Sequence, residues 1–186
     1  MHTTHDLQAT FSAGFYKWLF VTMSSVAVGC FLTFLSGFRF QWSDSVIAVV
    51  LSFTTTLFSF LAQAVIIRSE VGTRFARCLP WLLASSLVGW TVSILLVYPL
   101  LQLGDMSIDS ENLPFAALIG FLDGGAIGFA PGLSIGFVYW WLMRTDYNAK
   151  RLYVSTVIAW CLGMGFASAT MLTLVAIAVS RLIPIF

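Results

Sequence analysis

This chain has very little charge. Asp, Glu, Lys and Arg make up only 9% of its 186 residues, against about 25% in an ordinary soluble domain. Hydrophobic residues make up 59%, against about 45–50% in soluble domains. A soluble fold of this size needs a charged surface, and this chain has too few ionisable side chains to form one. The composition therefore predicts an integral membrane protein whose main partner is the lipid bilayer.

Motifs for catalysis, metal binding and nucleic-acid binding are also lacking. The three cysteines, Cys30, Cys78 and Cys161, are far apart and form no C-x-x-C, so they indicate neither a disulfide framework nor a zinc site. The HExxH, GxSxG and Walker patterns do not occur. A net charge of +1 without a basic stripe excludes nucleic acid as a partner. We therefore predict a protein that is not an enzyme and has no metal site.

Histidine is confined to a polar N-terminal tail of residues 1–13, at His2 and His5. The apolar remainder therefore offers no histidine to ligate a haem or a chlorophyll. No cofactor is evident, although the 17 phenylalanines leave a bound lipid or pigment open as an alternative.

Apolar segments long enough to cross a bilayer, which takes about 20 residues in a helix, fill the rest of the chain. They predict an all-α fold with five transmembrane helices in a single bundle over residues 14–186. The fourth segment is unusually long and contains Pro131, so it is either one kinked helix or a broken or re-entrant one. The five segments are roughly 15–36, 44–67, 79–103, 113–143 and 152–180.

Basic residues are concentrated in the loops after the second and fourth segments. The loop between the third and fourth segments, LGDMSIDSEN (103–112), has three acidic residues and no basic one. Loops rich in Lys and Arg remain in the cytoplasm. This distribution predicts a cytoplasmic N-terminus and a C-terminus outside.

An internal repeat relates the second and third segments to the fourth and fifth. The second and fourth segments end in QAVIIR (63–68) and YWWLMR (139–144), and the third and fifth contain SSLVGW (85–90) and STVIAW (155–160). Both units run in the same direction, so the pattern predicts a duplicated parallel helical hairpin. Its motif residues are Gln63, Arg68, Trp90, Tyr139, Trp140, Arg144 and Trp160.

Over residues 60–165 the chain resembles a group of small multi-pass membrane proteins, chiefly cyanobacterial. In that group a glycine-rich helix ends in G-x-x-Q-W-L-V-L-R, and here Gly136, Trp140 and Arg144 match, with Tyr139 in place of the glutamine. The group has no assigned activity. The resemblance implies a helical membrane bundle and a bacterial host, and hence a bacterial inner membrane or a thylakoid.

The fourth segment carries a glycine at every fourth position, which makes a stripe along one side of a helix. Small residues at this spacing let two helix backbones approach closely in lipid, so we predict a helix-packing face. Alternatively, the helix unwinds at Gly124–Gly125 or Pro131 and exposes carbonyl groups to an ion. The glycine ladder consists of Gly120, Gly124, Gly128, Gly132 and Gly136.

Asp123 is the one ionisable residue that lies inside an apolar segment, away from its ends. A carboxylate deep in lipid costs about 2.5–3.5 kcal/mol on the insertion scale, which makes it a candidate functional site. The favoured interpretation is an ion pair with Arg181, supported by a hydrogen bond from Tyr98, that fixes the fourth segment to the fifth. The alternative is a protonatable or cation-binding group in an outward-facing vestibule.

These features favour a structural or assembly component of a membrane complex, with other membrane protein subunits as its partners. The basis is an almost uncharged interior, small-residue contact faces and the lack of a domain outside the membrane. The alternative is a small transporter or channel that uses Asp123.

Overall fold

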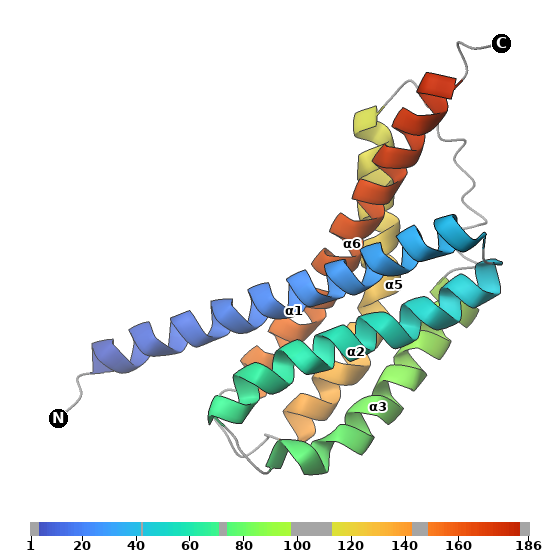
Figure 1. Cartoon of the computed structure of the whole chain (residues 1–186). Coiled ribbons are helices and arrows are strands. Elements are labelled where there is room, and N and C mark those ends of the chain that lie inside the picture. The colour runs from blue at the N-terminus through green and yellow to red at the C-terminus, as the bar shows by residue number, and fades with distance from the viewer. Residues whose placement is uncertain (1–3, 42, 71–73, 98–112, 143–148, 183–186) are drawn as a thin grey trace.

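The computed structural model describes residues 4–182 except for 42, 71–73, 98–112 and 143–148, and this part of the chain is almost entirely helical (Figure 1). The predicted all-helical fold is confirmed there. The elements are α1 (Thr4–Phe40), α2 (Asp44–Glu70), α3 (Arg74–Val92) with the π-helical turn η1 (Ser93–Val97), α5 (Leu113–Leu142) and α6 (Ala149–Leu182).

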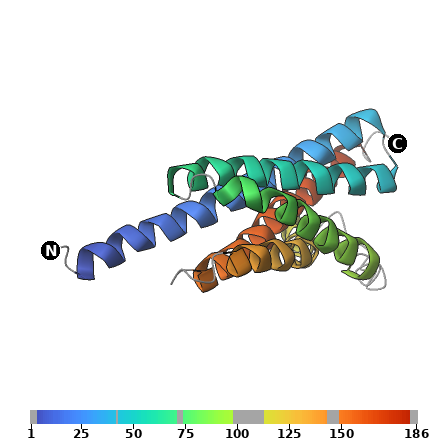
Figure 2. The same ribbon diagram turned by 90° about the horizontal axis from the view of Figure 1, so that it is seen from below.

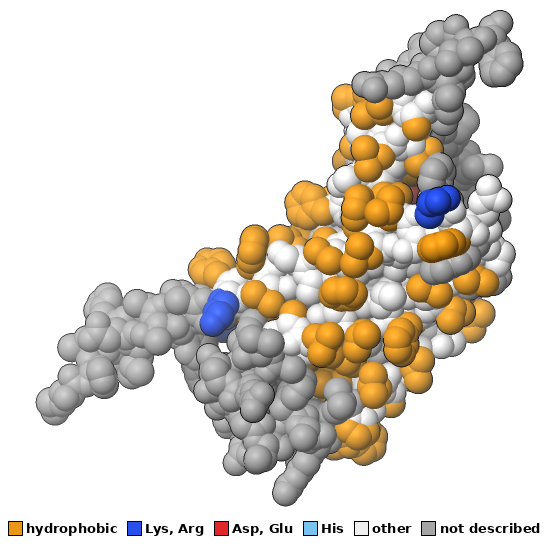
Figure 3. Space-filling model, in the orientation of Figure 1, with side chains coloured by type: hydrophobic (Ala, Val, Ile, Leu, Met, Phe, Trp, Pro, Cys, Tyr) orange, Lys and Arg blue, Asp and Glu red, His pale blue; other side chains and the backbone are white. Residues whose placement is uncertain are grey.

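Three of the helices contain described segments that are long and apolar enough to span a membrane. These segments are Tyr16–Gly37, Leu113–Trp141 and Ala149–Ala178. The described apolar stretches in the second and third helices, Val49–Gln63 and Pro80–Leu95, are shorter. Figure 3 shows hydrophobic side chains spread over the described part of one face, with isolated cationic side chains among them. Such a surface suits contact with lipid tails.

The fourth apolar segment forms one continuous helix, α5. It passes without interruption through Gly124, Gly125 and Pro131. The alternatives of a broken or re-entrant segment, and of glycines unwound around an ion, are therefore wrong for this part of the chain. Pro131 lacks an N–H, so one helical hydrogen bond is missing there, but buried packing keeps the helix in place.

The helices form two layers that cross each other. In both views α1 and α2 run side by side, and α1 extends beyond the bundle at its N-terminal end (Figures 1 and 2). The most extensive contact is between α5 and α6; α1 packs against both α2 and α6, and α3 packs against α5. Contacts of α1 with α6 lie along the middle of α1, where Trp18 meets Thr156 and Val26 meets Gly163.

Glycine makes the close approach of α5 to α6 possible. A Cβ atom at Gly124 would lie 2.4 Å from the backbone oxygen of Met164, and one at Gly128 would lie 2.6 Å from that of Trp160. The other three glycines of the ladder also face α6. The contact predicted for this stripe is therefore made within the chain, between its own fourth and fifth segments.

Candidate functional site

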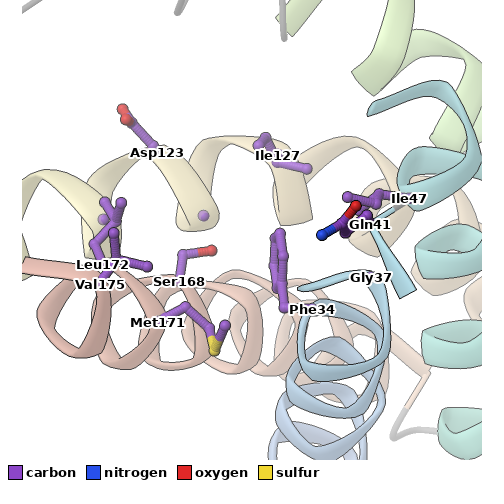
Figure 4. A pocket seen from close by; sticks show the side chains of 12 residues that line it. Phe34, Gly37, Gln41, Ile47, Asp123, Ile127, Ser168, Met171, Leu172 and Val175 are labelled. Carbon is purple, nitrogen blue, oxygen red and sulfur yellow. The ribbon is translucent and has the colours of Figure 1, made fainter. Parts of the chain in front are cut away.

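A cavity of about 650 Å³ lies where α1 and the start of α2 meet α5 and α6 (Figure 4). Its size falls within the range of about 300–1,000 Å³ that is typical of small-molecule sites. Most of its lining is apolar. The apolar side chains are Phe34 of α1, Ile47 of α2, Ile127 of α5, and Met171, Leu172 and Val175 of α6.

Asp123 is the only ionisable residue among the described residues that line this cavity. Its side chain is half-buried and points away from the α6 residues, so the carboxylate stands at the edge of the cavity (Figure 4). Among the side chains that the structure describes, none forms a hydrogen bond or an ion pair with it. The cavity therefore has an apolar interior and one anionic group at its margin.

The structure does not test the partners predicted for Asp123. Tyr98 lies outside the described residues, and so does the side chain of Arg181, although the backbone of Arg181 belongs to α6. The ion pair that would fix α5 to α6 stays a prediction. The glycine contacts described above already join these two helices closely without it.

The described lining also includes two neutral polar residues, Gln41 and Ser168, and three glycines. Gln41 directly follows α1 and has a φ of 52°, in the left-handed region, which costs an L-residue about 1–2 kcal/mol. This conformation lets the chain turn directly from α1 into α2, and the Gln41 side chain lies near Ile47 in Figure 4. Sequence reasoning missed both residues, because neither a glutamine nor a lone serine signals a cavity.

A separate cluster of buried polar side chains joins four helices at the centre of the bundle. The Gln63 amide donates to the Thr22 hydroxyl at 3.2 Å, and the Tyr139 hydroxyl donates to the Gln63 carbonyl oxygen at 2.5 Å. Nearby, the Trp18 indole donates to the Thr156 hydroxyl at 3.2 Å and packs edge-on against Tyr139. These side chains are neutral, and their hydrogen bonds satisfy each other. We assign the cluster a role in helix packing.

Corresponding residues of the internal repeat meet in the structure. Gln63 and Tyr139 hold the same place in the two units and form the hydrogen bond just described. Trp90 and Trp160 also correspond, and their rings pack edge-on with centroids 6.2 Å apart. Trp140 is half-buried and lies against Phe137. The remaining motif side chains, those of Arg68 and Arg144, lie outside the described residues.

Within the described part of the chain, no group of three or more His, Cys, Asp or Glu side chains comes together to hold a metal. No protein-family model matches this chain, and no characterised protein or solved structure is significantly similar to it. The resemblance to small cyanobacterial membrane proteins therefore stays a prediction from the motif. Any function has to be argued from the cavity and from Asp123.

Proposed function

We propose that this chain is a bacterial integral membrane protein with five spans, and that it acts as a small transporter whose substrate enters the cavity beside Asp123. One observation carries the proposal: a cavity of ligand size lies next to a carboxylate that no described residue neutralises. A charge kept in an apolar segment is costly, and it is usually retained for a substrate or an ion pathway.

The glycine ladder gives less support to an assembly component than the sequence suggested. That interpretation rested on an almost uncharged interior, on small-residue contact faces and on the lack of a domain outside the membrane. The five glycines instead face α6 of the same chain. The apolar outer surface does not indicate a protein partner either, because lipid requires the same surface.

The position of Asp123 along α5 agrees with an outward-facing vestibule. At about 1.5 Å per residue, Asp123 is about 15 Å from Leu113 and about 27 Å from Trp141. The Leu113 end follows the acidic loop 103–112, which the charge distribution places outside. Asp123 is thus nearer to the end of α5 that we assign to the exterior.

We also propose that α2–α3 and α5–α6 are duplicated hairpins related by an approximate two-fold axis. A residue contacts its own counterpart only near such an axis, and both Gln63–Tyr139 and Trp90–Trp160 do so. The two hairpins differ in how closely their own two helices approach each other. Thr56 lies seven residues before Gln63, as Gly132 lies seven before Tyr139. At this place a 2.7 Å hydrogen bond between the Thr56 and Ser86 hydroxyls joins α2 to α3, instead of close backbone contact.

Thiol labelling tests whether the cavity is open to the outside. In a variant without the native cysteines, Ser168→Cys places a thiol in the cavity lining, and Ser155→Cys places one on the same helix at a fully buried position. We expect a membrane-impermeant thiol reagent, added outside intact cells, to modify Ser168→Cys and to leave Ser155→Cys unmodified. Equal lack of labelling would contradict a vestibule, and labelling of Ser168→Cys only from the cytoplasmic side would contradict the orientation.

A further inference from the structure

We infer that the ligand of this cavity is a lipophilic organic cation, an onium or ammonium ion with a bulky apolar body. The inference rests on the proposed function, since it takes the cavity as a ligand site, and it names the chemistry of the substrate. The charge of the cavity lining, the size of the cavity and the arrangement of its side chains support the inference independently.

The charge of the lining selects the sign of the charge on the ligand. Among the described residues of the lining, Asp123 is the one ionisable residue and the other side chains are neutral. A carboxylate in an apolar environment needs a counter-charge, which none of the described side chains supplies. A cationic ligand provides that charge, whereas an anionic ligand would add a second unbalanced negative charge at the same place.

The size of the cavity and its described lining do not suit a bare metal ion as its occupant. Calcium binds about six to eight oxygen atoms, and magnesium requires a nearly ideal octahedron. Among the described lining residues, only Asp123, Gln41 and Ser168 have side-chain oxygen atoms, and the carbonyl groups of α5 are engaged in a continuous helix. A cavity of about 650 Å³ is also far larger than such an ion needs.

The arrangement of the lining matches a molecule with a charge at one end. Apolar side chains from four helices line the interior, among them Phe34, Ile127 and Leu172, whereas the Asp123 carboxylate stands at the edge (Figure 4). An apolar body between α1 and α6 would leave its cationic group beside Asp123. Transfer of such a body from water into this lining is favourable through the hydrophobic effect.

Two probes of nearly equal shape and opposite charge test the inference. Tetraphenylphosphonium is a cation and tetraphenylborate an anion, and binding of each to the purified full-length protein in lipid nanodiscs is measured by equilibrium dialysis against empty nanodiscs. We expect saturable binding of the phosphonium and at least tenfold weaker protein-specific binding of the borate. Asp123→Asn should weaken phosphonium binding at least tenfold while the melting temperature stays unchanged or rises, because no described partner is lost and a charge is removed from lipid.

A cavity-filling variant separates failure of this inference from failure of the proposed function. Ile127→Trp places a large side chain in the cavity, and Val175→Phe serves in its place if the first variant does not fold. If filling abolishes probe binding but Asp123→Asn does not weaken it, the cavity is a ligand site without cation preference, which overturns the inference alone. If neither substitution changes binding, or neither probe binds above empty nanodiscs, the cavity is not the site and both proposals fail.

Discussion

Gly124→Ala should lower the melting temperature of this protein by about 2–8 °C, whereas Gly125→Ala, one residue further along the same helix, should not lower it. The added methyl group at position 124 would lie 2.4 Å from the Met164 backbone oxygen and 2.5 Å from the Ser168 hydroxyl. At position 125 the nearest atom would be the Cys161 backbone oxygen at 3.6 Å, an ordinary contact.

The two substitutions add the same methyl group to the same helix and differ only in the atoms that this group would meet. Both replace glycine by alanine in the interior of α5, which by itself favours the helix by about 0.5–1 kcal/mol. At position 124 the obstacle is a backbone atom, which no change of side-chain rotamer can remove, so α5 and α6 must move apart. Overpacking of this kind costs about 1–3 kcal/mol.

Thermal unfolding of both variants and of the wild type in the same detergent measures the difference. Gly125→Ala is the matched control, and its melting temperature should equal or slightly exceed that of the wild type. Equal melting temperatures for the two variants would show that α5 and α6 do not approach each other as closely as the structure has them.

Gln63→Leu should destabilise the protein by about 1–3 kcal/mol, because it removes the acceptor of the Tyr139 hydroxyl and the donor to Thr22. Gln63 is fully buried, so no water replaces these partners. Tyr139→Phe removes only the hydroxyl and leaves the Gln63 carbonyl oxygen without this donor. Each substitution leaves a polar atom behind in an apolar environment.

The double variant Gln63→Leu/Tyr139→Phe should be more stable than the sum of the two single losses predicts. In double-mutant cycles, interhelical hydrogen bonds in membrane proteins have coupling energies of about 0.6 kcal/mol on average and about 1.7 kcal/mol at most. Denaturant unfolding of the four proteins in one detergent gives the coupling energy. Strictly additive losses would contradict the hydrogen bond between α2 and α5 and weaken the proposed two-fold relation of the hairpins.

The glycine ladder and the helical fold could be anticipated from the sequence because they depend on local patterns. A spacing of four residues keeps Gly124 and Gly128 on one side of any helix, and long apolar runs in lipid must be helical. The sequence also drew attention to Asp123, since a charge within an apolar run stands out. Each of these inferences needs only the residues of one segment.

The cavity could not be anticipated, because it depends on how distant segments cross. Phe34 and Leu172 are ordinary apolar residues whose sequence context says nothing about a common cavity, and only the crossing of α1 over α6 brings them together. The contact between Gln63 and Tyr139 has the same origin. The repeat showed that they correspond, and only the packing of α2 near α5 showed that they meet.

The most direct test of the cation site is a structure of the protein bound to tetraphenylarsonium, whose arsenic atom can be located by anomalous scattering. We expect a single arsenic peak in the cavity between α1 and α6, beside the Asp123 carboxylate. A peak elsewhere, or Asp123 paired with Arg181 and a cavity filled by the protein's own side chains, would contradict the account.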